Sequence, residues 1–339
     1  MITPTKYPYY EVHFMKAGDA DSIILAYKRD VTSNLVLVLI DAGNVTNSNQ
    51  IKEIIEERWE RNWVDIAVLT HPDTDHKGGF FGLLQDDKFE IKEFWTCLPW
   101  ISHYEDLTPG AEPILMPSIK DSIKIYSHPT DESINLIKLL CDRGVKIRDV
   151  CQGDDGLPII PLKVVGPTLE FGDRNASIMV SDFKEISDDE TFEAYVEDAE
   201  MTDEDAVSVI DKEEDDTSAT NMSSLILMFD PGRKFLLTGD ATRASLKAMI
   251  DENPNLFKNC VLKVPHHGSK HNLNTELINM LEPQQSAICA RGSKKHPNNS
   301  VVYWLSKTGN VYLTERGYFW YTSEPHNNSA TPLKYKIEK

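Results

Sequence analysis

The feature that most constrains this chain is a hexapeptide, His71-Pro72-Asp73-Thr74-Asp75-His76, which directly follows the apolar run Ile66-Ala67-Val68-Leu69. The apolar run indicates a buried strand. A strand places alternate side chains on one face, so His71 and Asp73 can point into the same site. The chain must then turn, and Asp75 and His76 can reach back from the start of the next helix. The alternative is a polar turn whose Asp caps that helix, which would require one Asp and neither histidine.

Two later segments add groups of the same kind. One is an apolar run over residues 235–238 that ends in Gly239-Asp240, and the other is a run over residues 261–264 that leads to His266-His267. Each has the pattern of a strand that delivers an Asp or His at its end. Imidazole and carboxylate suit divalent cations that activate water. Three such strand ends predict a dinuclear metal centre.

These motifs give the chain a family resemblance. It resembles the metallo-β-lactamase superfamily, and within it the soluble domain of ComEC-type competence proteins, nearly end to end. The similar segments are residues 12–24, 39–43, 71–79, 236–240, 265–269 and the pair His296-Pro297. The resemblance implies an α/β fold, a four-layer αββα sandwich with metals at one edge of two sheets.

The resemblance also implies roles for the metal-binding residues. It assigns His71 and Asp73 to one divalent metal, Asp75 and His76 to the other, and Asp240 as a bridge between the two. The last ligand is one histidine of the His266-His267 pair. We favour His267, which leaves His266 to contact substrate.

The sequence departs from the commonest family motif, His-x-His-x-Asp-His, because Asp73 replaces the second histidine. We find no clear match to the isolated third histidine that usually completes the first metal site. Asn221 lies where the ComEC-like branch carries Asn and Ser, and we expect it to bind substrate. Together with Asp75 and Asp240, Asp73 favours Mn²⁺ or Mg²⁺ over a purely zinc site.

A basic loop near the C-terminus, residues 291–300, contains further candidates. Lys294 and Lys295 could hold a phosphate, and His296 could protonate a leaving oxygen. The alternative is an exposed loop with an incidental histidine. We predict that Asp75 and His296 are the catalytic groups.

The competence branch implies a metal-dependent phosphodiesterase or nuclease, with nucleic acid or another phosphodiester as its partner. A second hypothesis is a metallohydrolase of a small-molecule ester, cyclic nucleotide or lactone, because no broad basic stripe is evident. A third, a binding module with a residual site, is disfavoured by the intact ligand set.

Composition fits a single hydrolase domain over residues 1–339, with 40% hydrophobic residues to form its core. No apolar run approaches the 18 or more residues of a membrane span, and the first residues lack the apolar stretch of a signal peptide. The five cysteines are scattered, which favours a reducing, cytoplasmic location and no contact with a membrane.

The net charge of −19 is concentrated in one segment. Residues 182–216 contain seventeen acidic residues and two lysines, so this segment carries −15. We interpret residues 176–220 as an acidic insertion within the domain. It is either a solvated loop or a site for a basic protein partner, and Phe192 and Tyr195 fall at the spacing of a short amphipathic helix.

The rest of the chain alternates between strand and helix patterns, which indicates a layered α/β architecture. The predicted strands are residues 35–40, 66–70, 159–165, 225–229, 234–238 and 260–264. The predicted helices contain Ile51 to Trp59, Ile134 to Cys141, Leu246 to Ile250 and Leu277 to Leu281, and another follows His296.

Overall fold

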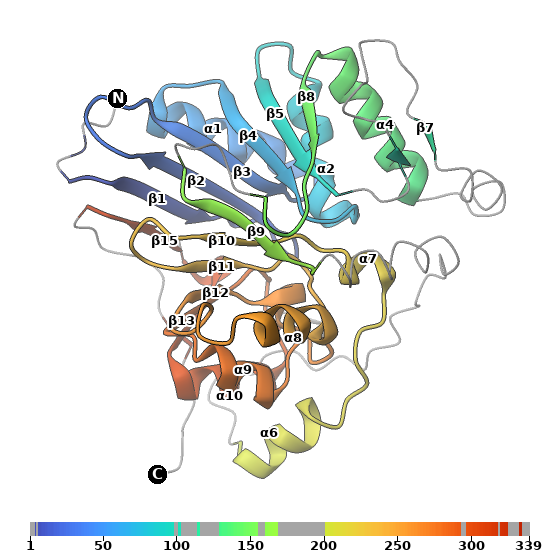
Figure 1. The fold of residues 1–339 in the computed structure, drawn as a ribbon, viewed down its shortest axis with the longest axis vertical. Helices are drawn as coiled ribbons and strands as arrows, with labels where there is room; N and C mark the ends of the chain where they lie inside the picture. Colours follow the sequence, from blue (N-terminus) through green and yellow to red (C-terminus); the bar gives the residue numbers. More distant parts are fainter. Residues whose placement is uncertain are drawn as a thin grey trace.

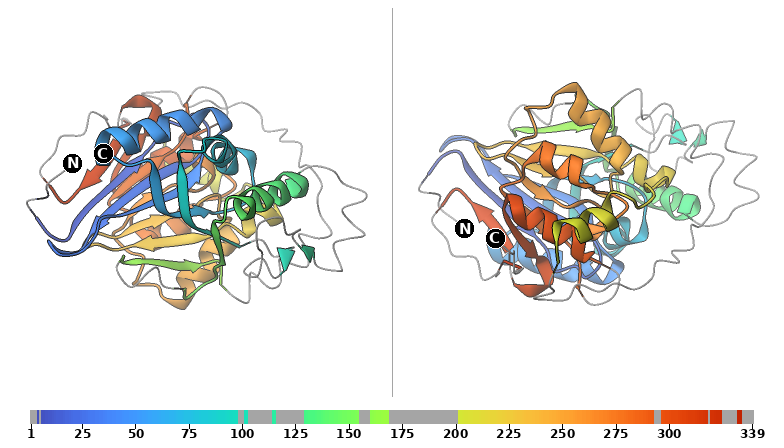
Figure 2. Two further views of the ribbon diagram at one scale, coloured as in Figure 1. Left: turned by 90° about the horizontal axis from the view of Figure 1, so that it is seen from above. Right: turned by 90° about the horizontal axis from the view of Figure 1, so that it is seen from below.

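A computed structural model describes residues 4, 6–97, 101–102, 114–115, 129–154, 160–168, 201–292, 296–317, 319–324 and 332–333. Its strands form two large sheets that lie face to face, with helices on the outer face of each (Figures 1 and 2). The predicted four-layer αββα sandwich is therefore confirmed.

The first sheet has seven strands in the order β15-β1-β2-β3-β4-β5-β8. Strands β1 to β3 are antiparallel, whereas β3, β4, β5 and β8 run parallel. The strand bounds are β1 Tyr9–Phe14, β2 Ser22–Lys28, β3 Val36–Ala42, β4 Trp63–Leu69, β5 Glu90–Thr96, β8 Lys146–Asp149 and β15 Phe319–Thr322.

The second sheet has six strands in the order β14-β13-β12-β11-β10-β9. Strands β11 to β14 are parallel, so their carboxyl ends share one edge. The bounds are β9 Leu162–Gly166, β10 Ile226–Phe229, β11 Phe235–Leu237, β12 Val261–Lys263, β13 Gln285–Ile288 and β14 Asn310–Leu313. A separate pair, β6 Ile101–Ser102 and β7 Ile114–Leu115, forms a two-stranded ribbon.

The helices cover the two outer faces. Those on the first sheet are α1 Ser48–Trp59, α2 Thr74–Leu84 and α4 Pro129–Asp142, and those on the second are α8 Arg243–Glu252, α9 Thr275–Leu281 and α10 Asn299–Thr308 (Figure 1). Helix α1 has the expected spacing, because Ile51, Ile55 and Trp59 are all buried. The short 3-10 segments are η1 Val45–Asn47, η3 Pro265–Gly268 and η4 Thr314–Arg316.

The sandwich has three apolar layers: one under each set of helices and one between the sheets. Strand β3 is apolar over residues 36–40 because both of its faces are buried. Its side chains alternate, so that Val38 and Ile40 pack between the sheets while Leu37 and Leu39 pack under the helices.

The described part of the acidic segment contains one helix that packs on the second helical layer. Helix α6, Asp203–Ile210, begins with a capping box between Thr202 and Asp205 and buries Ala206 and Ile210 against the second helical layer. Asp203 forms an ion pair with Lys307 of α10. Residues 203–210 therefore form a helix with two buried side chains, whereas residues 211–215 have no regular structure and are mostly exposed. Phe192 and Tyr195 lie outside the described residues.

Candidate metal centre

The hexapeptide crosses the junction between β4 and α2, as its pattern predicts. His71 follows the end of β4, Asp73 holds the N-cap position of α2 without a side-chain capping hydrogen bond, and Asp75 and His76 occupy the first turn of the helix. An acidic residue is favourable there because helix N-termini carry a partial positive charge. The His71 and His76 rings are fully buried, and their centroids are 4.0 Å apart.

Glycine allows α2 to approach the sheet closely enough for this arrangement. A Cβ at Gly79 would collide with the backbone of Ala42 at the end of β3. A Cβ at Gly78 would collide with the backbone of Asn44 and Val45 just after that strand, so both glycines are explained by the close approach of α2.

A buried carboxylate behind the site fixes both histidine rings. Asp41 accepts hydrogen bonds from the Thr70 backbone N–H at 2.8 Å and the Thr70 hydroxyl at 2.7 Å, and its Oδ2 lies 2.8 Å from His76 Nδ1. Thr70 Oγ1 lies 3.1 Å from His71 Nδ1. With both Nδ1 atoms engaged, both Nε2 atoms are left to face the site.

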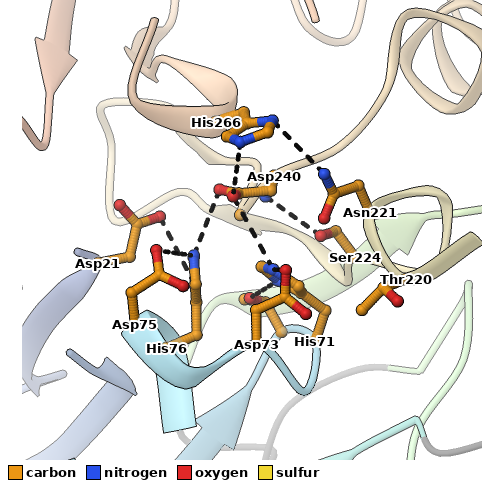
Figure 3. A network of polar contacts seen from close by, with 12 residues as sticks. Asp21, His71, Asp73, Asp75, His76, Thr220, Asn221, Ser224, Asp240 and His266 are labelled. Carbon is orange, nitrogen blue, oxygen red and sulfur yellow. Dashed lines mark hydrogen bonds and ion pairs between the residues drawn. The ribbon is translucent and has the colours of Figure 1, made fainter. Parts of the chain in front are cut away.

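Asp240, directly after Gly239 at the end of β11, lies at the centre of these groups (Figure 3). Its Oδ1 is 3.4 Å from His76 Nε2, and its Oδ2 is 3.9 Å from the Nε2 atoms of His71, His266 and His267. The Asp240 backbone N–H donates to Ser224 Oγ at 3.1 Å. The Asp240 carboxylate therefore faces four of the histidines that the sequence singled out.

The two neighbouring histidines follow β12 and have different surroundings. His267 Nδ1 is 2.7 Å from the Cys289 carbonyl oxygen, and its Nε2 is 3.0 Å from Asp75 Oδ2. His266 Nδ1 is 3.1 Å from Asn272 Oδ1. Both histidines have left-handed backbone angles, with φ of 45° and 54°. Such residues typically cost about 1–3 kcal/mol each and concentrate at functional sites.

A buried lysine lies beneath Asp240. Lys263 forms an ion pair with Asp21, donates to the Gly239 carbonyl at 2.8 Å, and has its Nζ 3.6 Å from Asp240 Oδ1. Burial alone would lower its pKa, but Asp21 and Asp240 raise it above the usual value. Lys263 is therefore a permanent cation that offsets part of the carboxylate charge.

The histidine and carboxylate charges stabilise one another. Burial would lower the pKa of His76, but Asp240 and Asp75 raise it well above its usual value. Burial would also lower the pKa of His266, but Asp240 and Asp216 raise it to about 9. Burial would raise the pKa of Asp240, but His76, His266 and His267 hold it well below its usual range. Protonated histidines thus balance the acids, and a bound cation would displace those protons.

The donor set fits a divalent metal. Ligand atoms of Asp75, His76, Asp240 and His267 all lie within 4.8 Å of one another. His71 Nε2, His76 Nε2 and Asp240 Oδ1 are buried and have no hydrogen-bond partner among the described residues. Buried polar atoms are seldom left unpaired, and two imidazoles with two carboxylates are suitable zinc or manganese ligands. A second group of acids around His76, formed by Asp21 and Asp41, supports this centre from behind.

The structure brings most of the predicted site residues together. His296 is buried, with its ring centroid 5.5 Å from that of His266 and 5.9 Å from that of His267. Asn221 is also buried, and its Nδ2 is 3.4 Å from His266 Nδ1. Lys294 and Lys295 lie outside the described residues.

The sequence did not single out several supporting residues, namely Asp21, Asp41, Asp216, Lys263 and Asn272. For Asp21 and Asp41 a signal was available, since both lie in segments that resemble family turns. Lys263 was hidden within an apolar strand.

No family model matches the chain. The chain is 34% identical over 102 residues, 29% of its length, to ComE operon protein 3 of Bacillus subtilis (strain 168), and it spans 13% of that protein's length.

Among solved structures, the chain is similar to Igni18, a metallo hydrolase from Ignicoccus hospitalis, with 10% identity and a TM-score of 0.43 over 94% of this chain and all of that one. It is also similar to a diphosphatase of the PhnP family, with 9% identity and a TM-score of 0.41 over 93% and 98% of the two chains. A third is ST1585, a metallo-β-lactamase superfamily protein from Sulfolobus tokodaii, with 15% identity and a TM-score of 0.31 over 90% and 86%.

Proposed function

We propose that this protein is a metal-dependent phosphodiesterase, acting on nucleic acid, that activates water at a centre of two divalent metal ions. The observation that carries the proposal is Asp240, whose Oδ2 faces His71 and whose Oδ1 faces His76, with Asp75 and His267 in the same cluster as His76. One carboxylate between two sets of imidazoles is the arrangement needed to bridge two cations.

The proposed ligands form two groups around this bridge. His71 and Asp73 would hold one metal, and Asp75, His76 and His267 the other. When bound, such a pair lowers the pKa of coordinated water and neutralises charge on the reacting phosphate. We expect Mn²⁺, Mg²⁺ or Zn²⁺ to fill the sites.

The remaining groups have roles in binding and proton transfer. The Asp75 side chain is 31% exposed, so its free oxygen can accept the proton of an attacking water. His296 and His266 lie side by side on the opposite wall. We assign His296 to protonate the leaving oxygen and His266 to contact the phosphate, with Asn221, Lys294 and Lys295 as further substrate-binding residues.

A second candidate function is hydrolysis of a small-molecule ester, cyclic nucleotide or lactone. The observation that favours it is the acidic segment, whose helix α6 and following residues pack beside the second helical layer. A negative surface near the site repels a polyanion, whereas a small substrate is less affected.

The first test is mutation of the bridging and helix carboxylates. Asp240→Ala and Asp75→Ala should each abolish hydrolysis of bis-p-nitrophenyl phosphate and lower the metal content measured by elemental analysis. Asp251→Ala, which removes an exposed carboxylate of α8, is the control and should change neither. Full activity in Asp240→Ala would overturn the proposed mechanism.

The second test separates the substrates. Cleavage of single-stranded DNA or RNA should weaken with rising salt, because phosphate contacts release counterions. Replacing Lys294 and Lys295 with Ala should reduce nucleic-acid cleavage much more than turnover of the small diester. Equal loss on both substrates, or no cleavage of any nucleic acid, would favour the small-molecule function.

A further inference from the structure

The last residues of the acidic segment, Asp211 to Asp216, run along the wall of the metal centre. Asp211 accepts a hydrogen bond from the Thr275 N–H at 2.9 Å, at the start of α9. Arg243 of α8 binds the Glu213 carbonyl at 3.1 Å and the Asp215 carboxylate at 2.9 Å. The segment is therefore anchored to two helices before it reaches Asp216.

The Asp216 carboxylate accepts hydrogen bonds from several residues of the site. Its Oδ2 accepts from Asn221 Nδ2 at 2.7 Å and Asn272 Nδ2 at 2.9 Å, and lies 3.4 Å from His266 Nδ1. Its Oδ1 accepts from the Ser218 N–H at 2.8 Å. The side chain is 8% exposed, so this carboxylate is a buried acceptor rather than a surface charge.

These bonds fix two groups that the proposed function uses. With Nδ1 of His266 held by Asp216 and Asn272, its Nε2 is left on the side of Asp240, 3.9 Å from Oδ2. With Nδ2 of Asn221 bound to Asp216, the amide cannot flip without losing that bond. Figure 3 shows Asn221 between His266 and Ser224, with its nitrogen toward His266. Asn221 Oδ1 is buried and has no hydrogen-bond partner among the described residues, so it is available to a ligand of the centre.

We propose that Asp216 is a positioning residue of the metal centre, which orients the His266 ring and the Asn221 amide toward Asp240. This inference rests on the proposed function and adds to it a part for the acidic segment. That segment supplies an internal group of the site in addition to its surface charge.

The test uses Asp216→Asn, which keeps the size of the side chain and removes its charge. Asp215→Asn is the matched control, because it removes the same charge one residue away, from a side chain that is 51% exposed and bound to Arg243. Proteins labelled with ¹⁵N at histidine are compared by NMR in the metal-free state, and the His266 resonances are assigned with His266→Gln.

In the wild-type protein we expect a His266 Nδ1 proton that is shifted downfield and protected from exchange. Asp216→Asn should lose this signal and Asp215→Asn should retain it. In the metal-loaded protein, Asp216→Asn should lower kcat about 10- to 100-fold with little change in KM, as is typical when a buried partner of an active-site group is removed. Asp215→Asn should stay within about twofold of the wild type, on the scale of surface changes.

Unchanged His266 resonances and unchanged kcat in Asp216→Asn would overturn the inference. The wild-type spectrum decides the question even if that variant does not fold, because absence of the protected His266 proton also contradicts it. If the wild-type protein hydrolyses no phosphodiester, the proposed function fails, but the NMR comparison still tests the positioning role.

Discussion

Asp41 shows how one buried residue can set the geometry of two ligands. It has a left-handed φ of 52°, its side chain is 2% exposed, and it binds both Thr70 and His76. Carboxylates that hold a ligating histidine from behind fix its ring orientation and raise its basicity. The cost of the strained backbone is thus offset at the metal centre.

We expect Asp41→Asn to lower metal affinity about 10- to 100-fold, the usual effect of losing such a partner. Asn tolerates the left-handed conformation, so this variant isolates the loss of the carboxylate from backbone strain. Affinity is measured by isothermal titration with Mn²⁺ or Zn²⁺, and Asp251→Asn serves as the control. Wild-type affinity in Asp41→Asn would show that Asp41 has no part in holding His76.

At the scale of single residues, the sequence was most informative where ligands follow a strand directly. His71, Asp73, Asp75 and His76 are adjacent in the chain, and local geometry alone brings them together. The contact of Asp216 with His266 joins residues 50 positions apart and comes from a segment with no apolar period. Patterning cannot reveal such a contact, because it depends on how residues 211–215 are bonded to α8 and α9.

At the scale of elements, continuous apolar runs correctly predicted strands. The predicted strands at 35–40 and 66–70 correspond to β3 and β4, and the run at 260–264 to β12, each with ends shifted by up to three residues. Strands β13 and β14 and helix α6 were not predicted. Helix α6 lies within a dense acidic stretch, where charge concealed the two buried positions, Ala206 and Ile210.

Close packing of α2 against β3 gives a prediction at this scale. Gly79→Ala places a methyl group on the Ala42 backbone, and overpacking of this kind typically costs about 1–3 kcal/mol. We expect a lower free energy of unfolding by that amount in denaturant titrations, together with weaker metal binding, because the first turn of α2 carries Asp75 and His76. Gln85→Ala, at the exposed end of the same helix, should have a much smaller effect. A Gly79→Ala protein as stable as the wild type would contradict the close approach.

At the scale of the whole molecule, the metal centre joins the two sheets. The first sheet and α2 supply His71, Asp73, Asp75 and His76, whereas the second sheet supplies Asp240 and His267. No described helix is long and apolar enough to cross a membrane. The alternating patterns indicated a layered α/β architecture, and the family resemblance narrowed it to the four-layer αββα sandwich, which periodicity alone does not distinguish from other α/β folds.

The raised pKa of His266 predicts that the stability of the metal-free protein depends on pH. The pKa of His266 is about 9 in the folded protein and about 6.5 in an unfolded chain. A raised pKa stabilises the fold fully below about pH 6.5, and this contribution is lost as the pH rises through about 9. Thermal unfolding of the metal-free protein should therefore occur at a lower temperature at pH 9 than at pH 6.5.

Added Mn²⁺ should restore stability at pH 9, since a ligand that binds only the folded state stabilises it by mass action. The rise in melting temperature should be larger at pH 9 than at pH 6.5, because protons compete for the same nitrogens. Asp240→Ala should show no rise at either pH. Equal melting temperatures of the metal-free wild type at the two pH values would contradict the charge balance.

The division of ligands between the sheets also has a consequence for biosynthesis. The four proposed ligands of residues 71–76 leave the ribosome first, and Asp240 follows only after more than 160 further residues have been added. At typical elongation rates of about 5–20 residues per second, this leaves a delay on the order of ten seconds or more. During that delay a nascent chain has four of the six proposed ligands, so the complete centre can form only after His267 has been added.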